Sequence, residues 1–188
     1  MKTISPLRLG MLGLLVVLGV ALIPLIGRAQ DDKDDVTQWE GKPAPEIALS
    51  TLDGKDFKLV EQKGKVVVVD IWATWCPPCR KSLPHLNKLS EDKGKAEKGL
   101  LIAAANSGEK KDVVEKFVKE NKYTFTVLMD EQSSLSKTLG VRGIPTTLVV
   151  GRDGVVKNVF VGFGPGSEKL LDDAVDKALA EDAPGKTE

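Results

Sequence analysis

Two cysteines, Cys76 and Cys79, are the only ones in the 188-residue chain, and two residues separate them. This spacing places the second thiol one helical turn beyond the first, within reach of it for a disulfide. A continuous apolar run of β-branched residues at 66–72 precedes the pair and predicts a buried strand. A segment compatible with a helix, from 80 to about 93, follows it. We therefore expect Cys76 where a strand ends and a helix begins.

A thiol at the start of a helix is activated, because free N–H groups and partial positive charge at that end favour the thiolate. The thiolate is the nucleophile in thiol–disulfide exchange. We expect Cys76 to be the exposed thiol that attacks a partner disulfide, and Cys79 to be buried behind it and to resolve the mixed disulfide. Pro77 and Pro78 suit the first helical turn, where a missing N–H costs little.

Asp70 is the candidate base that removes the proton of Cys79. It stands six residues before Cys76 in an otherwise apolar strand, which predicts a buried carboxyl. A buried, unpaired carboxyl has a raised pKa, and this suits proton transfer near neutral pH. The alternative is a side chain that points to solvent, because alternation along a strand leaves the choice of face open.

Composition limits the classes of function. Basic and acidic residues number 27 each, so no excess of positive charge indicates a nucleic-acid partner. The length suits one sizeable domain, and two cysteines cannot form a disulfide-stapled scaffold. A structural zinc site needs four ligands, whereas only Cys76, Cys79 and the single histidine, His85, are available. We therefore predict no metal site.

Residues 1–29 have the pattern of an export signal peptide. Basic residues come first, an apolar stretch at 9–26 is interrupted by Pro24, and small residues precede a cleavage point after Ala29. The apolar stretch is also just long enough for an uncleaved N-terminal membrane anchor. Either reading places the rest of the chain in a periplasmic or other extracytoplasmic compartment, with membrane contact only through this segment.

The rest of the chain is read as an acidic tether at 30–40, one domain at 41–181 and a disordered tail at 182–188. Turn residues and periodicity predict a β-hairpin at 47–59 and strands at 100–105, 124–129, 147–150 and 155–161. Helices are expected at 110–121, 133–139 and 168–180, with residues 91–98 as an exposed connection. We expect Ser167 to cap the last helix and Leu170 to face inward. This alternation predicts an α/β fold with a mixed sheet and helices on both faces.

The stretch at 71–84, with Trp75, Cys76, Cys79 and Pro84, resembles the thioredoxin superfamily, and more narrowly the TlpA/ResA group of exported bacterial thioredoxins. The resemblance extends over roughly residues 41–180. It implies a thioredoxin-like fold that carries an N-terminal β-hairpin and a β-α insertion. It also implies an extracytoplasmic thiol-disulfide oxidoreductase that reduces disulfides of exported proteins, including a role in cytochrome c maturation.

A second motif at 141–147 contains Gly143, Ile144 and Pro145. The resemblance implies that the Ile144–Pro145 bond is cis and that Pro145 packs against the two cysteines. Gly143 and Ile144 are expected to offer backbone groups to an extended partner chain. Trp75 is expected to shape the docking surface, and Pro77 and Pro78 complete the predicted set of substrate-binding residues.

The sequence departs from the TlpA/ResA pattern at two places. That group usually has Asn at the position of Asp70 and Glu at the position of Ser82. Asp70 instead matches the buried acid of thioredoxins proper. The departure leaves the role of Ser82 open and suggests a thioredoxin-like proton acceptor on a TlpA-like frame.

The resemblance also bears on cofactors and partners. It implies no cofactor beyond the redox-active disulfide Cys76–Cys79. The expected partners are proteins with disulfides or dithiols and a membrane protein that supplies electrons, and we expect a monomer. The sequence names neither the physiological partner nor the electron donor.

Two other functions are open at this point. The opening of the domain also resembles peroxiredoxins, but a peroxidase is expected to have Thr three residues before the reactive cysteine, where this chain has Ala73. A copper-binding chaperone with a thioredoxin fold is the other alternative, because Cys76 and Cys79 suit soft Cu(I). Such carriers tend to have wider cysteine spacing and a distal histidine, and this chain has only His85. Metal titration and disulfide reduction assays separate these functions.

Overall fold

The structure is a computed structural model that describes residues 35–182. The predicted signal peptide, the first part of the predicted tether and residues 183–188 lie outside the described residues. The elements, in chain order, are η2 (Val36–Trp39), β1 (Ala48–Thr51), β2 (Asp56–Lys58), η3 (Leu59–Gln62), β3 (Val66–Trp72), α1 (Pro77–Glu91), α2 (Lys93–Glu97), β4 (Leu100–Ser107), α3 (Lys111–Asn121), β5 (Thr126–Asp130), α4 (Ser134–Leu139), β6 (Thr146–Val150), β7 (Val156–Val161) and α5 (Ser167–Ala180).

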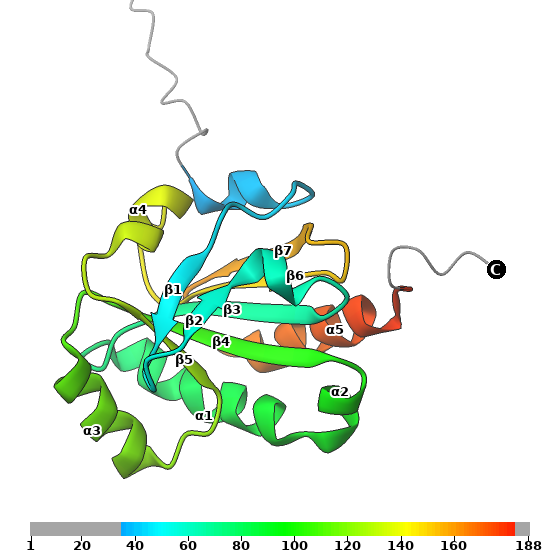
Figure 1. Ribbon diagram of the computed structural model, residues 1–188. Helices are drawn as coiled ribbons and strands as arrows, with labels where there is room; N and C mark the ends of the chain where they lie inside the picture. Colours follow the sequence, from blue (N-terminus) through cyan, green and yellow to red (C-terminus); the bar gives the residue numbers. More distant parts are fainter. Residues whose placement is uncertain (1–34, 183–188) are drawn as a thin grey trace, which may run out of the picture. The chain divides into compact units, whose positions relative to one another are not determined.

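One mixed sheet organises the described residues, and its strands run in the order β2-β1-β5-β4-β3-β6-β7 (Figure 1). Strands β3, β4 and β5 are parallel, whereas β1 and β6 join this set in the antiparallel sense. Strand β3 is buried along its whole length, as its β-branched run predicts. The mixed sheet and its N-terminal hairpin confirm the predicted fold class.

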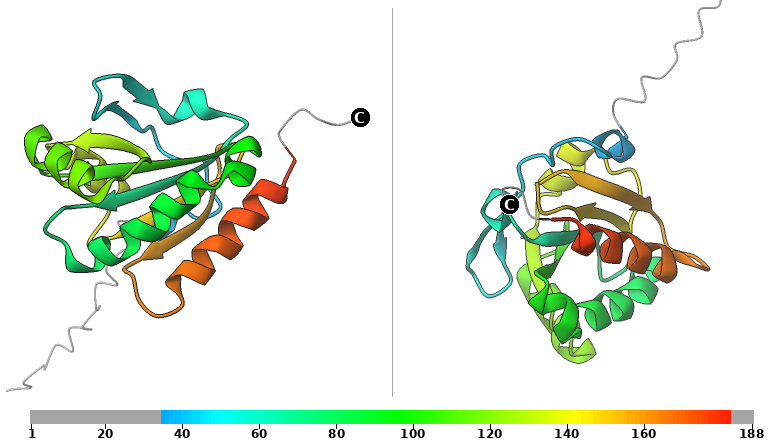
Figure 2. Two further views of the ribbon diagram at one scale, coloured as in Figure 1. Left: turned by 90° about the horizontal axis from the view of Figure 1, so that it is seen from below. Right: turned by 90° about the vertical axis from the view of Figure 1, so that its right-hand side faces the viewer.

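Alternate residues of β3 face two different apolar cores. Val66, Val68 and Trp72 pack with residues of α1, α3 and α5, and Figure 2 shows α1 and α5 side by side on this face. Val67, Val69 and Ile71 pack on the other face with residues of α4, η2, η3 and the hairpin. The period of two along a strand explains this division. Asp70 is in register with Val68 and Trp72, so its side chain belongs to the face that α1 covers.

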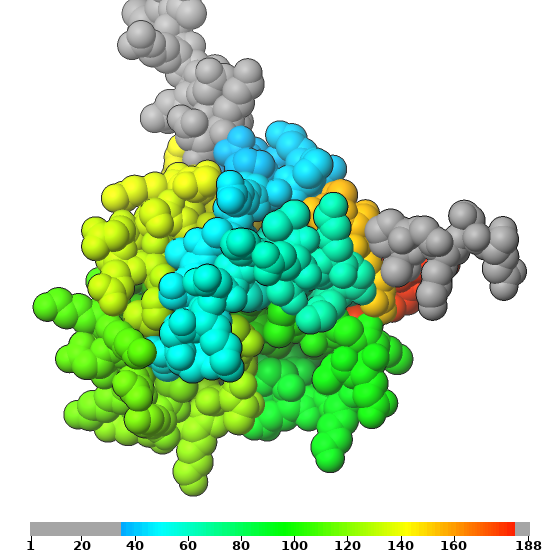
Figure 3. Space-filling view, viewed as in Figure 1, coloured from blue at the N-terminus to red at the C-terminus, as the bar shows by residue number. Residues whose placement is uncertain are grey.

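The hairpin β1–β2 extends the sheet through antiparallel pairing of β1 with β5. In the space-filling view, the segment from β1 to η3 covers the middle of the face turned to the viewer (Figure 3). Among residues 35–182, no helix has the length and apolar character needed to cross a bilayer.

Residues 36–39, which we predicted as part of the tether, form η2. Val36 is buried, and the indole N–H of Trp39 donates to the carbonyl of Leu139 at 3.2 Å. Asp35 caps the turn by accepting from the N–H of Thr37. The prediction of a solvated tether up to residue 40 is therefore wrong for these residues, because two apolar side chains pack against the domain.

Residues 91–98 are a mostly exposed connection, as predicted, and residues 93–97 within it form α2, in which the Asp92 carboxylate caps the N–H of Lys95. Two predictions about the last helix are wrong. Leu170 is 58% exposed, since the apolar stripe of α5 is narrower than predicted. Ser167 is the first residue of α5, and its hydroxyl accepts from the N–H of Gly164 in the preceding loop.

Candidate active site

The two cysteines lie at the end of β3, where the chain turns into α1. Cys76 is the N-cap residue of α1, and Pro77 and Pro78 occupy the first two helical positions. The cysteines are joined in a disulfide with Cα atoms 5.3 Å apart. The N–H of Cys79 donates to the Cys76 sulfur at 3.2 Å. The predicted strand-to-helix junction is confirmed, and both prolines lie in the first turn of α1, as predicted.

The degree of exposure of Cys76 differs from the prediction. In the disulfide, Cys76 is 2% exposed and Cys79 is fully buried, so the expectation of an exposed Cys76 thiol is wrong for this oxidised form. The cause is the neighbouring loop: the Cys76 sulfur lies 3.6 Å from the carbonyl oxygen of Ile144. The exposed surface beside the disulfide is instead the side chain of Trp75, which is 68% exposed.

The loop before β6 forms the other wall of the site. The Ile144–Pro145 bond is cis, as the resemblance implied. The carbonyl of Pro145 accepts from the N–H of Gly162 at 2.7 Å, and the carbonyl of Gly143 accepts from the hydroxyl of Thr146 at 2.7 Å. The Gly143 carbonyl, one of the backbone groups of this loop, is thus engaged within the protein.

Asp70 is fully buried, so the alternative of a side chain that points to solvent is wrong. Its Oδ1 accepts from the hydroxyl of Thr147 at 2.6 Å, and its Oδ2 has no hydrogen-bond partner among the residues that the structure describes. Burial raises the pKa of Asp70 to about 7, because the charged form loses its hydration, and the Thr147 hydrogen bond only partly opposes this. The carboxyl can therefore exchange a proton near neutral pH.

Ser82 and His85 lie further along α1. Ser82 is buried, and its hydroxyl donates to the carbonyl of Cys79 at 3.0 Å, a local bond within the helix. His85 Nε2 lies 2.9 Å from the carboxylate of Asp172, which links α1 to α5. Within residues 35–182, no group of three or more His, Cys, Asp and Glu side chains is arranged to hold a metal ion.

Sequence reasoning missed a carboxylate beside the active-site loop. Glu109, which follows β4, accepts from the backbone N–H of Thr74 at 2.6 Å and from the Thr74 hydroxyl at 2.5 Å. It also accepts from the side-chain amide of Asn106 at 2.8 Å. The sequence did contain a signal: the polar residues Asn106 and Glu109 follow an apolar strand. Because the carboxyl ends of adjacent parallel strands meet at one edge of a sheet, these residues could have been placed near the loop that follows β3.

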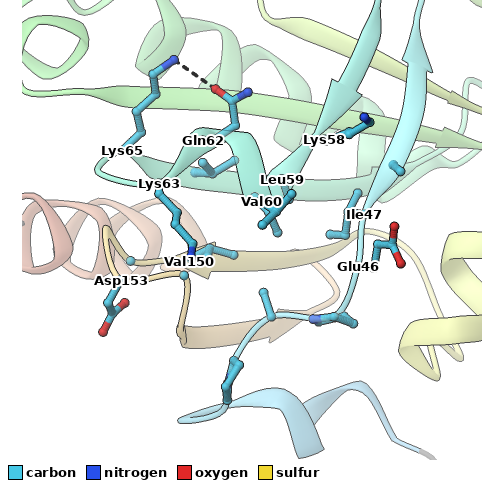
Figure 4. Close-up of a pocket in the computed structure, with 17 residues that line it drawn as sticks. Glu46, Ile47, Lys58, Leu59, Val60, Gln62, Lys63, Lys65, Val150 and Asp153 are labelled. Atoms are coloured by element: carbon cyan, nitrogen blue, oxygen red, sulfur yellow. Dashed lines mark hydrogen bonds between the residues drawn. The ribbon is translucent and has the colours of Figure 1, made fainter. Parts of the chain in front are cut away.

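A hollow lies at the opposite end of β3 from the cysteines. Its volume is about 530 Å³, and Ile47, Leu59 and Val150 line it, with Lys63 and Asp153 at its margin (Figure 4). None of the predicted site residues lines it. The predicted site residues therefore lie around the junction of β3 and α1 and not in this hollow.

A cysteine pair at a strand-to-helix junction, opposite a cis-proline loop on a mixed sheet, defines a thioredoxin-fold dithiol centre. The model of the Redoxin family matches residues 39–175, and the chain belongs to that family. The thiol-disulfide oxidoreductase ResA of Geobacillus thermodenitrificans is 37% identical over 122 residues, which are 65% of this chain and 69% of that protein. The thioredoxin-like protein YneN of Bacillus subtilis is 35% identical over 153 residues, 77% of this chain and 88% of that protein.

Solved structures agree with this assignment. A putative thiol:disulfide interchange protein DsbE from Chlorobium tepidum matches with a TM-score of 0.70 and 34% identity, and the match covers 75% of this chain and 98% of that one. The chain is a thiol-disulfide oxidoreductase with a thioredoxin-like fold, which confirms the activity that the resemblance implied.

Proposed function

We propose that this protein is an exported reductant of protein disulfides. Cys76 is the attacking thiol, Cys79 is the resolving thiol, and Asp70 is the proton acceptor for Cys79. The observation that carries the proposal is the disulfide at the N-terminus of α1, in which the Cys76 sulfur occupies the N-cap position and accepts the N–H of Cys79. A helix N-terminus stabilises the Cys76 thiolate, whereas Cys79 lies inside the first turn and is fully buried.

The proposed reaction starts from the reduced dithiol. The Cys76 thiolate attacks one sulfur of the partner disulfide, that S–S bond breaks, and the other partner sulfur leaves as a thiolate. The Cys79 thiol then gives its proton to Asp70, and its thiolate attacks the Cys76 sulfur. This step forms the Cys76–Cys79 disulfide, breaks the mixed disulfide and releases the second partner sulfur as a thiolate. Two electrons pass from the cysteine pair to the partner.

The proposed docking surface surrounds the cysteine pair. Trp75 and Pro77 are exposed beside it, Pro78 is half-buried, and Gly143 is exposed on the facing loop. Ile144 is half-buried with its carbonyl next to Cys76, and Pro145 is buried beneath. An extended partner strand placed along this loop brings its disulfide to the Cys76 sulfur.

Replacing Trp75 with alanine is expected to weaken docking and to leave stability nearly unchanged. An exposed aromatic anchor at an interface contributes more than about 1 kcal/mol to binding, so we expect KM for a protein disulfide to rise about fivefold to tenfold. The free energy of unfolding should change by less than about 0.5 kcal/mol, because the side chain is 68% exposed.

Steady-state reduction of insulin checks this prediction, with Val60→Ala as the control. Val60 is an equally exposed apolar side chain, 63% exposed, and it lies on η3, away from the cysteines. A KM that changes as little in Trp75→Ala as in Val60→Ala would remove Trp75 from the docking surface.

We infer the direction of electron flow from the hydrogen-bond donors around the Cys76 sulfur. Pro77 and Pro78 have no N–H, so the Cys79 N–H is the donor that the first turn offers to the Cys76 sulfur. The guanidinium of Arg80 lies 5.5 Å from the ring centre of Phe117, which directs this charge toward α3. A less stabilised thiolate means a less stabilised dithiol form, and therefore a more reducing couple.

Equilibration with a glutathione redox buffer tests this direction. We expect a reduction potential nearer to about −270 mV, the reducing end for proteins of this fold, than to about −120 mV, the oxidising end. Under millimolar reduced glutathione the Cys76–Cys79 disulfide should therefore persist. Ready reduction by that buffer would identify an oxidant and would contradict the proposed direction.

Export is part of the proposal and rests on residues 1–29, which have the pattern of a signal peptide or an N-terminal anchor. One solved structure, 26% identical to this chain, carries a name that fits this compartment: an exposed lipoprotein thioredoxin from Streptococcus pneumoniae. We propose exported proteins with cysteine pairs as substrates, apocytochromes c among them, a membrane protein as electron donor, and a monomeric chain. Cell fractionation and trapping of partners test these points.

A further inference from the structure

The carboxylate of Glu109 holds the loop that leads into Cys76. Three donors converge on it: the backbone N–H of Thr74, the hydroxyl of Thr74 and the side-chain amide of Asn106. The bond from the Thr74 hydroxyl measures 2.5 Å, within the range of charge-assisted O–H···O⁻ hydrogen bonds, and the bond from its backbone N–H measures 2.6 Å. Thr74 is two residues before Cys76, and the exposed Trp75 lies between them.

The topology explains why residues so far apart in the sequence meet here. Strands β3 and β4 are parallel, and Trp72 at the end of β3 is in register with Asn106. The chain leaves both strands at the same edge of the sheet, so the loop before α1 and the turn before α3 lie beside each other. Asn106 is fully buried, and its side-chain amide holds one carboxylate oxygen of Glu109 in place.

We propose that Glu109 is a positioning residue for disulfide exchange: its carboxylate fixes the loop 73–75 and thereby sets how a partner disulfide is presented to Cys76. The inference rests on the proposed function of Cys76 and Trp75. Glu109 itself follows β4 and touches neither sulfur in the contacts described above. Glu109 therefore acts indirectly. It holds the backbone of Thr74, and Thr74 is followed by the docking side chain of Trp75 and by Cys76, the N-cap of α1.

A carboxylate suits this task better than its amide counterpart. An ionised carboxylate is an acceptor at both oxygens, so it can satisfy all three donors at once. A glutamine at this position has one acceptor oxygen, which in the place of Oε2 can still accept from the Thr74 N–H and from the Asn106 amide. Its NH₂ group cannot accept from the Thr74 hydroxyl and can only donate to it. Glutamine should therefore preserve part of the arrangement, and alanine none of it.

The test compares reduced Glu109→Ala, Glu109→Gln and wild-type protein in stopped-flow reactions with two disulfides. One is a peptide disulfide that docks on the loops, and the other is bis(2-hydroxyethyl) disulfide, which is too small to do so. Since a misplacement of about 1 Å costs up to about 10²-fold in rate, we expect Glu109→Ala to slow the peptide reaction about tenfold or more. The small disulfide should react less than threefold more slowly, and Glu109→Gln should recover part of the peptide rate.

Glu115→Ala is the matched control, because Glu115 is another glutamate whose carboxylate, among residues 35–182, pairs only with Lys119 on the surface of α3. Its two rates should equal those of the wild type. The free energy of unfolding is measured for every variant, so that a purely structural contribution appears as lost stability with an unchanged ratio of the two rates. That unchanged ratio in Glu109→Ala would overturn the proposal.

Thr74→Ala provides a second route if Glu109→Ala does not fold. It removes the hydroxyl bond and keeps the backbone N–H bond, so a smaller loss, about threefold for the peptide, is expected. Peptide rates within twofold of the wild type in both Thr74→Ala and Glu109→Gln would equally overturn the proposal. A wild-type protein that reduces neither disulfide would instead contradict the proposed function, so the two failures are distinguishable.

Discussion

Replacement of Cys79 with serine is expected to convert the protein into a covalent trap for its partners. Cys76 keeps its place at the N-cap of α1, and the backbone N–H of residue 79 still donates to its sulfur. The first attack therefore proceeds, but no thiol remains to break the mixed disulfide. We expect a stable one-to-one adduct with a peptide disulfide, visible as added mass that dithiothreitol removes.

Cys76→Ser should abolish exchange instead, because the remaining thiol of Cys79 is fully buried inside the first turn of α1 and lacks the N-cap position that stabilises a thiolate. Loss of the nucleophile should lower the rate of disulfide reduction below the detection limit, a loss of at least about 10³-fold relative to the wild type. The two variants are each other's matched control, since both replace one sulfur with oxygen in the same helical turn. An adduct that forms on Cys76→Ser and not on Cys79→Ser would reverse the assigned roles.

Asp70→Asn is expected to stabilise the oxidised protein at alkaline pH. Burial raises the pKa of Asp70 from 3.8 to about 7, so between these values the folded state holds a proton that the unfolded state releases. Wild-type stability must therefore fall as pH rises through this window, by about 4 kcal/mol at 1.36 kcal/mol per pKa unit. Asparagine is neutral at every pH, so the variant does not lose stability in this way as the pH rises.

We accordingly expect the stability difference between Asp70→Asn and the wild type to grow by about 4 kcal/mol in favour of the variant from pH 4 to pH 8. Urea unfolding at both pH values measures it, on the disulfide form so that thiol titration does not contribute. Asp130→Asn is the matched control: Asp130 is also buried, but it accepts from Ser134 and Leu135, so the same change should destabilise. A pH-independent difference for Asp70→Asn would show that Asp70 is already ionised in the fold.

The same variant tests the proposed proton transfer. Without a carboxylate to accept the Cys79 proton, the second step of exchange should slow by about 10²-fold, the lower end for a positioned general base. The first attack by Cys76 should change far less. Equal rates of resolution in Asp70→Asn and the wild type, followed by stopped flow, would remove Asp70 from the mechanism.

Local patterns were sufficient for the parts of the site that lie within a few residues of one another. The β-branched run of β3, the prolines after Cys76 and the buried position of Asp70 each follow from periodicity or helix chemistry, and the structure has all of them. The cis bond before Pro145 could not be derived in this way, because Ile144 is 68 residues beyond Cys76 in the sequence, and the bond was expected only from the resemblance.

The parts that sequence reasoning missed are contacts between distant segments. The burial of Cys76 is caused by the carbonyl of Ile144, and the hold on Thr74 is provided by Glu109, 35 residues further along the chain. Neither contact leaves a periodic signal in the sequence. A single apolar side chain, Val36, in an acidic segment does not predict burial, because the residues of α4 that it packs against lie far away in the sequence. The residues of η2 were therefore predicted as part of a tether.

The central claim is that Cys76 and Cys79 act as an exchanging dithiol, and one measurement tests it most directly. The reduced wild-type protein is mixed with one equivalent of a peptide disulfide, quenched with acid at successive times, and analysed by mass spectrometry with peptide mapping. We expect a transient adduct on Cys76, followed by the Cys76–Cys79 disulfide and one equivalent of fully reduced peptide. A peptide disulfide that remains intact, or an adduct that first appears on Cys79, would contradict the account.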